Sequence, residues 1–270
     1  MVDAGDLLLI AVDIAREAGE LARRRRTEGV AVAATKSTLA DIVTEADREV
    51  EDLIRARLAA ARPGDGFLGE ESGAERGTTG ITWVVDPIDG TVNYLYDIPA
   101  YAVSIGLVEG DPDPTTWRPL SGVVINAATG ERFEATRGGG ATLDGRPIRV
   151  ADAVPAATAL VGTGFGYDAG RRQRQAAIVQ QLIGEVRDIR RIGAAALDLA
   201  NVACGRLNAY YEIGLQPWDF AAGALIVEEA GGSLHGWQGE APGSRFLLAA
   251  HPQMAAELLE LLAPLPVGDV

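Results

Sequence analysis

Two stretches near the start of the chain carry apolar side chains at helical spacing. In residues 5–26 the apolar positions recur every three or four residues, which predicts an amphipathic helix that ends in a run of four arginines. A second helix is predicted over 44–61, where a Pro-Gly-Asp-Gly turn follows and stops it. The connecting residues, 29–42, look irregular.

Short apolar runs separated by turn residues predict strands in the middle of the chain. The runs at 67–69, 101–109, 120–126 and 132–136 fit a short strand followed by an antiparallel meander of hairpins. From about residue 155 strands and helices alternate, with strands predicted at 159–162, 207–212 and 246–249 and helices at 171–184, 193–204, 218–230 and 252–263. Because no flexible linker separates the two patterns, we expect two intimately packed halves, residues 1–150 and residues 151–270.

The most informative apolar run, 81–85, ends on an acid. Asp86 closes the run, a second carboxylate follows at Asp89, and Gly90 then lets the chain turn tightly. Two carboxylates and several backbone N–H groups therefore converge at one strand end. Carboxylates hold hard cations such as Mg²⁺, and N–H groups at a helix start hold phosphate. The pattern favours metal-assisted chemistry on a phosphate, although Asp-Pro and Asp-Gly are also common turn dipeptides.

The composition leaves carboxylates as the main candidates for catalysis. The 270 residues include one cysteine, Cys204, which excludes an intramolecular disulfide and a cysteine cluster for zinc, and only two histidines, His235 and His251. The net charge of −14 disfavours nucleic acid as a partner, and the arginines at 23–26 are better explained as the complement of a helix dipole. Bound divalent cations would explain how so acidic a protein holds a phosphate.

The N-terminus lacks the pattern of a secretory signal. Asp3 and Asp6 stand where basic residues would precede the apolar run 7–10. No apolar stretch approaches the roughly 20 residues of a membrane span. We therefore expect a soluble, cytoplasmic protein that acts on a small-molecule phosphate ester and not at a membrane.

Acidic residues recur where strands meet helices. Each has an ordinary explanation when taken singly: Asp47 stands in the N3 position of a capping box that begins at Thr44, and Asp219 can complement a helix dipole. These explanations weaken together, because the same residue type recurs at the kind of place where α/β sheets form their sites. The acidic positions are Asp47, Glu70, Glu71, Asp86, Asp89, Glu212 and Asp219.

Four motifs in chain order resemble those of the inositol monophosphatase family, which comprises Mg²⁺-dependent, Li⁺-sensitive phosphomonoesterases. They are Val43-Thr44-Glu45-Ala46-Asp47, Gly69-Glu70-Glu71-Ser72, residues 83–94, and Trp218-Asp219-Phe220-Ala221-Ala222 leading to Glu229-Ala230-Gly231-Gly232. Residues 191–200 also look like the family's bacterial members, and Tyr94 departs from its usual phenylalanine. The resemblance covers nearly the whole chain. It implies an α/β (α+β) fold, the layered αβαβα sandwich of the inositol monophosphatase and fructose-1,6-bisphosphatase type, and a homodimer.

Carried over residue by residue, the resemblance implies a site for two to three Mg²⁺ ions. Glu70, Asp86 and the backbone carbonyl of Ile88 would bind the first ion, and Asp86, as a bridging ligand, would bind the second with Asp89 and Asp219. A third, weaker ion would lie near Glu70, which is counted among the catalytic residues. Most ligands thus lie in the first half, residues 1–150, and the second half, residues 151–270, completes the site. Because packed carboxylates repel, some of their pKa values should be raised without metal.

The resemblance also implies how water and substrate are handled. Thr91 and Asp47 would form a hydrogen-bonded pair that orients and deprotonates the attacking water. The N–H groups of Gly90 and Thr91 would receive the phosphate. The leaving alcohol would contact Asp89, Ala195 and Glu212.

The substrate is left open among related phosphate esters. Glu212, within 210–214, favours inositol monophosphate or another polyol or sugar phosphate, whereas relatives act on fructose 1,6-bisphosphate, NADP, 3′-phosphoadenosine 5′-phosphate or histidinol phosphate. An alternative from a different class is a non-catalytic binding or regulatory protein, against which the full set of ligands argues. The loop at 31–41, which carries Lys36, is expected to close over the site.

Overall fold

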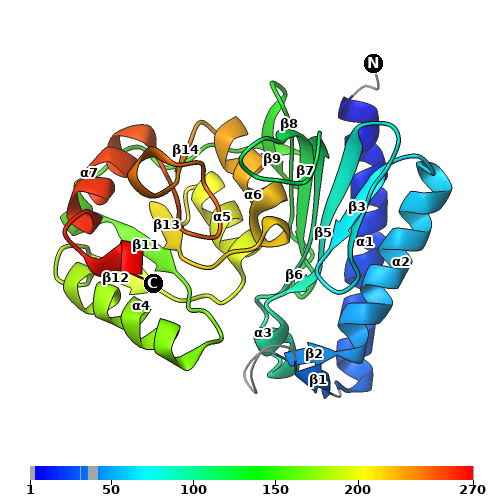
Figure 1. Ribbon diagram of the computed structural model, residues 1–270, viewed down its shortest axis with the longest axis horizontal. Helices are drawn as coiled ribbons and strands as arrows, with labels where there is room; N and C mark the ends of the chain where they lie inside the picture. Colours follow the sequence, from blue (N-terminus) through cyan, green and yellow to red (C-terminus); the bar gives the residue numbers. More distant parts are fainter. Residues whose placement is uncertain (1–3, 31, 36–41, 270) are drawn as a thin grey trace.

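Helices and sheets alternate in five layers. The computed structural model describes residues 4–30, 32–35 and 42–269. Figure 1 shows the layers in order: the helices α1 and α2, a large sheet, the helices α5 and α6, a smaller sheet, and the helices α4 and α7. This arrangement confirms the predicted layered αβαβα sandwich.

The larger sheet has eight strands in the order β10-β9-β8-β7-β6-β5-β3-β4. The strands β3 and β5 are parallel, and every other neighbouring pair is antiparallel. Most residues of β5 to β7 are buried, because helices cover both faces of the sheet. The strands are β3 (Gly66–Gly69), β4 (Gly73–Glu75), β5 (Ile81–Asp89), β6 (Ala102–Glu109), β7 (Arg118–Asn126), β8 (Arg132–Thr136), β9 (Gly140–Leu143) and β10 (Arg146–Pro147).

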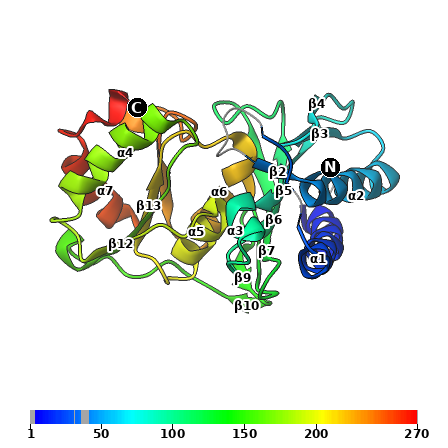
Figure 2. The same cartoon turned by 90° about the horizontal axis from the view of Figure 1, so that it is seen from below.

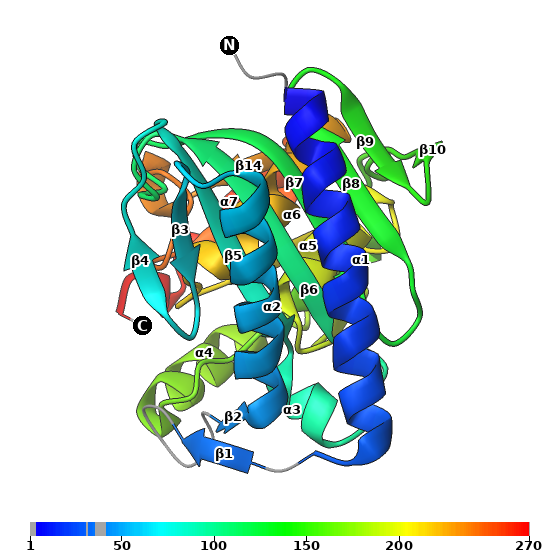
Figure 3. The ribbon, with the colours of Figure 1, turned by 90° about the vertical axis from the view of Figure 1, so that its right-hand side faces the viewer.

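Two long helices, α1 (Ala4–Glu28) and α2 (Glu45–Ala61), lie side by side on the outer face of this sheet (Figure 3). Their apolar sides pack onto β5, β6 and β7 in one core. The helix α2 begins with the predicted capping box: Thr44 Oγ1 accepts from the backbone N–H of Asp47, and Asp47 Oδ2 accepts from the backbone N–H of Thr44 at 2.8 Å. Asp47 is thereby fixed at the start of α2.

The short helix α3 (Thr91–Leu95) follows β5 directly. Its Tyr94 is fully buried, packs edge-on against Tyr101, and donates its hydroxyl to the carbonyl of Ala22 at 2.9 Å. Tyr94 replaces the family's usual phenylalanine, and its additional hydroxyl therefore links α3 to α1.

The middle layer, α5 (Ala195–Ala203) and α6 (Pro217–Glu229), is apolar almost all round because it packs on both sheets. Residues 220–227 of α6 are all buried. Two glycines of the large sheet let α6 approach it closely. A Cβ atom at Gly106 would lie 2.8 Å from Ala221 Cβ, and a Cβ atom at Gly122 would lie 2.9 Å from Ala222 Cα. This packing brings the start of α6, which carries Asp219, to the end of β5.

The smaller sheet has five strands in the order β12-β11-β13-β15-β14. The strand β11 is parallel to both neighbours, and β15 is antiparallel to β13 and β14. The helices α4 (Ala169–Leu182) and α7 (Pro252–Leu262) cover its outer face (Figure 2). The strands are β11 (Leu160–Thr163), β12 (Asp188–Arg190), β13 (Ala209–Glu212), β14 (Ser233–His235) and β15 (Leu247–Ala250).

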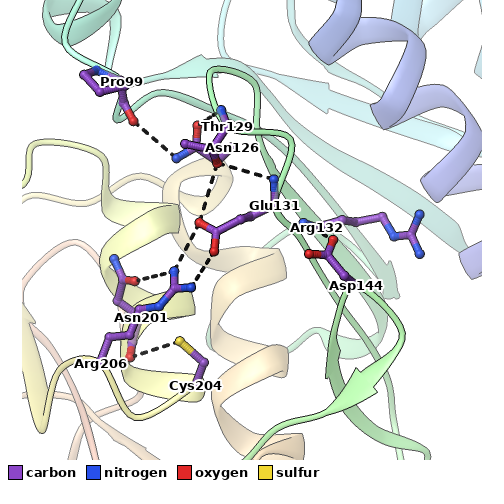
Figure 4. A network of polar contacts seen from close by, with 9 residues as sticks. All are labelled: Pro99, Asn126, Thr129, Glu131, Arg132, Asp144, Asn201, Cys204 and Arg206. Atoms are coloured by element: carbon purple, nitrogen blue, oxygen red, sulfur yellow. Dashed lines mark hydrogen bonds and ion pairs between the residues drawn. The ribbon is translucent and has the colours of Figure 1, made fainter.

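A polar contact joins the turn between β7 and β8 to the loop between α5 and β13 (Figure 4). Arg206 Nη1 lies 3.1 Å from Glu131 Oε2. The same guanidinium contacts Asn201 and lies over the ring of Phe133, 5.9 Å from the ring centroid. Because the ion pair is partly exposed, it contributes little to stability by itself. The contact fixes how the loop after α5 meets the large sheet.

Most predicted elements are confirmed within two residues at each end. The prediction of irregular structure at 29–42 is wrong, because β1 (Val32–Thr35) and β2 (Ile42–Thr44) form an antiparallel pair. The predicted strand 81–85 continues to Asp89. None of the described helices is long and apolar enough to cross a lipid bilayer.

Candidate active site

A cavity of about 590 Å³ opens at the end of β5, where loops of the second half face the first. All but one of the predicted site residues line it. Those from the first half are Glu70, Asp86, Ile88, Asp89, Gly90 and Thr91, and those from the second half are Ala195, Glu212 and Asp219. The remaining predicted residue, Asp47, lies behind Thr91. Lys36 and the residues 36–41 lie outside the described residues.

An irregularity in β5 aims its two acids into this cavity. Residues three apart on a regular strand point to opposite faces. The pairing of β5 with β6 shifts between Asp86, which faces Ser104, and Asp89, which faces Ala102. The extra residue breaks the alternation, so both carboxylates line the cavity. Gly90 then turns the chain with φ of 88°, in a space where a side chain would lie 2.9 Å from the carbonyl of Ala100.

Four carboxylates, those of Glu70, Asp86, Asp89 and Asp219, line the cavity at this strand end. Burial raises the pKa of Asp86 well above its ordinary value, and the negative charges of the other three raise it further. The pKa of Asp219 is raised in the same way, first by burial and then by Glu70. A group of like charges with this environment suits divalent cations, whose charge offsets the repulsion.

The fit to Mg²⁺ rests on the donor set. Asp86 Oδ1 is buried and has no hydrogen-bond partner in the described structure, and oxygen donors of this kind are those that Mg²⁺ prefers. Among the described residues, no three His, Cys, Asp or Glu side chains already stand in a metal-binding arrangement.

Asp89 is held by the first turn of α5. Its carboxylate accepts from the backbone N–H groups of Ala195, at 3.2 Å, and Ala196, at 2.7 Å. Burial raises the pKa of Asp89 to about 7, although these two hydrogen bonds lower it. Ala195 therefore takes part through its backbone, and it links the acid of β5 to the second half.

Asp47 and Thr91 form the predicted pair. Thr91 Oγ1 lies 3.3 Å from Asp47 Oδ1 and 3.2 Å from the carbonyl of Ile88. Asp47 Oδ2 also accepts from the hydroxyl of Thr44 at 2.5 Å. Burial raises the pKa of Asp47 to about 7, against the effect of the hydrogen bonds from Thr44. The same carboxylate therefore caps α2 and approaches the cavity through Thr91.

Glu51, which the sequence reasoning missed, fixes the loop that carries Glu70. Its buried carboxylate accepts from the backbone N–H groups of Glu71, at 2.9 Å, and Ser72, at 2.7 Å. A side chain at Gly69 would clash with it. The sequence signal that could have identified Glu51 is its position four residues after Asp47, on the apolar face of the predicted helix.

Glu212 stands at the end of β13 on the same strand face as Tyr210, whose hydroxyl donates to Glu212 Oε2 at 2.5 Å. Burial raises the pKa of Glu212, and the charge of Arg191 lowers it. A side chain at Gly164 would clash with the carboxylate. No role was predicted for Tyr210, Arg191 or Gly164, because their proximity to Glu212 depends on contacts between segments that are distant in the sequence.

The carboxylate cluster gives the metal-free protein an unusual pH dependence. Asp47 and Asp89 have raised pKa values of about 7, so the folded state holds protons that the unfolded state releases above about pH 4. This contribution to stability is complete below about pH 4 and is lost as the pH rises through 7. We expect the melting temperature in EDTA to fall by several degrees from pH 5.5 to 8, and Mg²⁺ to restore it at pH 8.

Differential scanning fluorimetry of the wild type and of Asp86→Asn checks this expectation. The melting temperature of the variant should depend less on pH and should rise less with Mg²⁺, since the variant lacks one of the buried acids. A melting temperature in EDTA that rises over this pH range in the wild type contradicts the expectation.

Comparison with known proteins places the chain in a family. The model of the inositol monophosphatase family matches residues 3–265. The chain is 44% identical over 272 residues to the inositol-1-monophosphatase SuhB of Mycobacterium tuberculosis, covering 94% of this chain and 92% of that protein. It is 38% identical over 262 residues to the Nus factor SuhB of Xylella fastidiosa, covering 94% and 93%. The solved structure of a staphylococcal IMPase-II with inositol monophosphate bound has a TM-score of 0.77 at 26% identity, covering 95% and 96%.

Fold, site and relatives together define a phosphoric monoester hydrolase of the inositol-phosphate type. The chain belongs to the inositol monophosphatase family. The resemblance drawn from the four sequence motifs is thereby confirmed.

Proposed function

We propose that this phosphatase is Mg²⁺-dependent and hydrolyses inositol monophosphate or a related polyol or sugar phosphate. The observation that carries the proposal is the group of buried carboxylates, with the unpartnered Asp86 Oδ1, beside the glycine turn that starts α3. The proposed ligands of two to three ions are Glu70, Asp86, the carbonyl of Ile88, Asp89 and Asp219. Bound Mg²⁺ supplies a water of lowered pKa and neutralises charge on the phosphoryl and leaving oxygens.

The chain's own groups orient the reactants. The N–H groups of Gly90 and Thr91 receive phosphoryl oxygens at the start of α3. Thr91 Oγ1 accepts the hydrogen bond of the attacking water, and the proton passes toward Asp47 Oδ1, which lies 3.3 Å from Thr91 Oγ1. A carboxyl with a pKa of about 7 is suited to accept a proton near neutral pH.

Glu212 and Asp89 face the leaving alcohol. Glu212 is oriented by Tyr210, and its free oxygen can accept a hydrogen bond from a sugar hydroxyl. Asp89 is oriented by the N–H groups of Ala195 and Ala196. Rigid acceptors at these positions support a polyhydroxylated alcohol as the leaving group.

Membership of the family supports two further proposals, inhibition by Li⁺ and a homodimer. The relative named Nus factor SuhB supports a second candidate function, participation in a transcription complex beside catalysis. The complete set of carboxylates argues that such a role would be added to the phosphatase activity.

Phosphate release from a substrate panel tests the proposal. The panel contains inositol 1-phosphate, fructose 1,6-bisphosphate, NADP, 3′-phosphoadenosine 5′-phosphate and histidinol phosphate, each with Mg²⁺ or with EDTA. We expect turnover only with Mg²⁺ and the highest kcat/KM on inositol 1-phosphate. Turnover that persists in EDTA would refute the metal dependence, and a higher kcat/KM on another ester would reassign the substrate.

A further inference from the structure

An arginine without a partner among the described residues stands in the wall of the active-site cavity. Arg171 and Arg191 line it beside the acids. Burial raises the pKa of Glu212 and of Asp198, and the positive charge of Arg191 lowers the pKa of both acids. Within the residues that the structure describes, the guanidinium of Arg171 makes neither a hydrogen bond nor an ion pair. Its charge is therefore available to a ligand.

The fold holds Arg171 in place between two loops. A side chain at Gly214, where φ is +102°, would lie 2.9 Å from Arg171 Nη1, and one at Gly166 would lie 2.9 Å from Arg171 Cδ. One turn further along α4, the buried Gln175 accepts from the N–H of Gly166 at 2.9 Å and donates to the carbonyl of Ile213 at 3.0 Å. Gln175 thus fixes both loops that flank the guanidinium.

The segments next to Arg171 differ from those that carry the proposed contacts of the reacting phosphate. Its neighbours, Gly166 and Gly214, belong to the loops after β11 and β13, whereas the proposed phosphate contacts, Gly90 and Thr91, belong to the turn after β5. A guanidinium repels metal ions and binds phosphate or carboxylate through paired N–H groups. In a cavity of about 590 Å³ there is room for an anionic group besides the one that reacts.

We propose that Arg171 forms a subsite for a second anionic group, a phosphate or a carboxylate, carried by the alcohol moiety of the substrate. The proposal rests on the proposed phosphatase function and extends it to substrates with two anionic groups. Because the second group is remote from the bond that breaks, Arg171 contributes mainly to binding, and its loss should appear in KM and not in kcat.

Paired kinetics on two substrates test the subsite. The Mg²⁺-loaded wild type, Arg171→Ala, Arg171→Lys and the control Arg174→Ala are compared on fructose 1,6-bisphosphate and on inositol 1-phosphate. Arg174 lies on the same helix but is exposed and outside the cavity lining, so its replacement makes the same charge change. We expect Arg171→Ala to lower kcat/KM on the bisphosphate about tenfold or more, through KM, and to leave inositol 1-phosphate within about twofold.

The other outcomes separate the two proposals. An equal loss on both substrates would place Arg171 at the reacting phosphate, and no loss on either would leave it without a role in binding; both overturn the subsite while the phosphatase stands. A wild type that releases phosphate from no ester would overturn the proposed function and the subsite with it. Partial retention by Arg171→Lys and full retention by Arg174→Ala support the subsite.

Discussion

Replacing Asp86 by Asn is expected to lower kcat by about a thousandfold or more, which corresponds to on the order of 4 kcal/mol of transition-state stabilisation. Asp86 is the proposed bridging ligand of two ions, and its buried Oδ1 has no partner within the described structure. An amide keeps the shape of the side chain but lacks the charge that two cations need. The loss should therefore appear in activity and in Mg²⁺ affinity, measured by phosphate release over a Mg²⁺ titration.

Asp52→Asn is the matched control for this experiment. Asp52 is an exposed acid on α2 and does not line the cavity, so the same substitution there should leave activity unchanged. An Asp86→Asn protein that folds and keeps the wild-type Mg²⁺ dependence would remove Asp86 from the proposed ligand set.

The second large effect is expected from Asp47→Asn, which should lower kcat by about 10²–10⁴-fold. Asparagine cannot accept the proton that Thr91 relays, and its amide adds a donor where the carboxylate now accepts from Thr44 and Thr91. At saturating Mg²⁺, the acidic limb of the pH profile of kcat/KM, which reports protonation of the base, should disappear in the variant.

A double-mutant cycle with Thr91→Ala separates the relay from a fold defect. If Asp47 and Thr91 act as a unit, the double variant should be no slower than the worse single variant. Glu45→Gln, at an exposed position in the same turn of α2, should retain full activity. Losses that multiply in the double variant would mean that the two residues act independently.

The sequence predicted what short-range patterns encode. Helical and strand periodicities located most elements of both halves, and the acid after the apolar run 81–85 pointed to the site. The capping-box spacing of Thr44 and Asp47 marked the start of α2 to within one residue. The division into residues 1–150 and residues 151–270, the metal ligands and the residue roles stay predictions.

The remaining features depend on contacts between distant segments. Glu51 was missed because its partners, the N–H groups of Glu71 and Ser72, are 20 and 21 residues away. Arg171 and Gln175 belong to no recognisable motif. Their positions in the site follow only from the contacts between α4 and the loops after β11 and β13. The pairing of β1 with β2 was missed for the same reason, since it depends on cross-strand contacts and not on a local apolar pattern.

The shared middle layer sets the order in which the chain can bury its surfaces during synthesis. The eight-stranded sheet is complete at Pro147, but α6, which covers its inner face, ends at Glu229. At a synthesis rate of about 5–20 residues per second, α6 is completed on the order of ten seconds after the sheet. Throughout that interval the apolar surface of β5 to β8 is open to other chains. A ribosome-bound intermediate of this protein is therefore a natural client for chaperones, and a chain that stops before α6 leaves an aggregation-prone sheet.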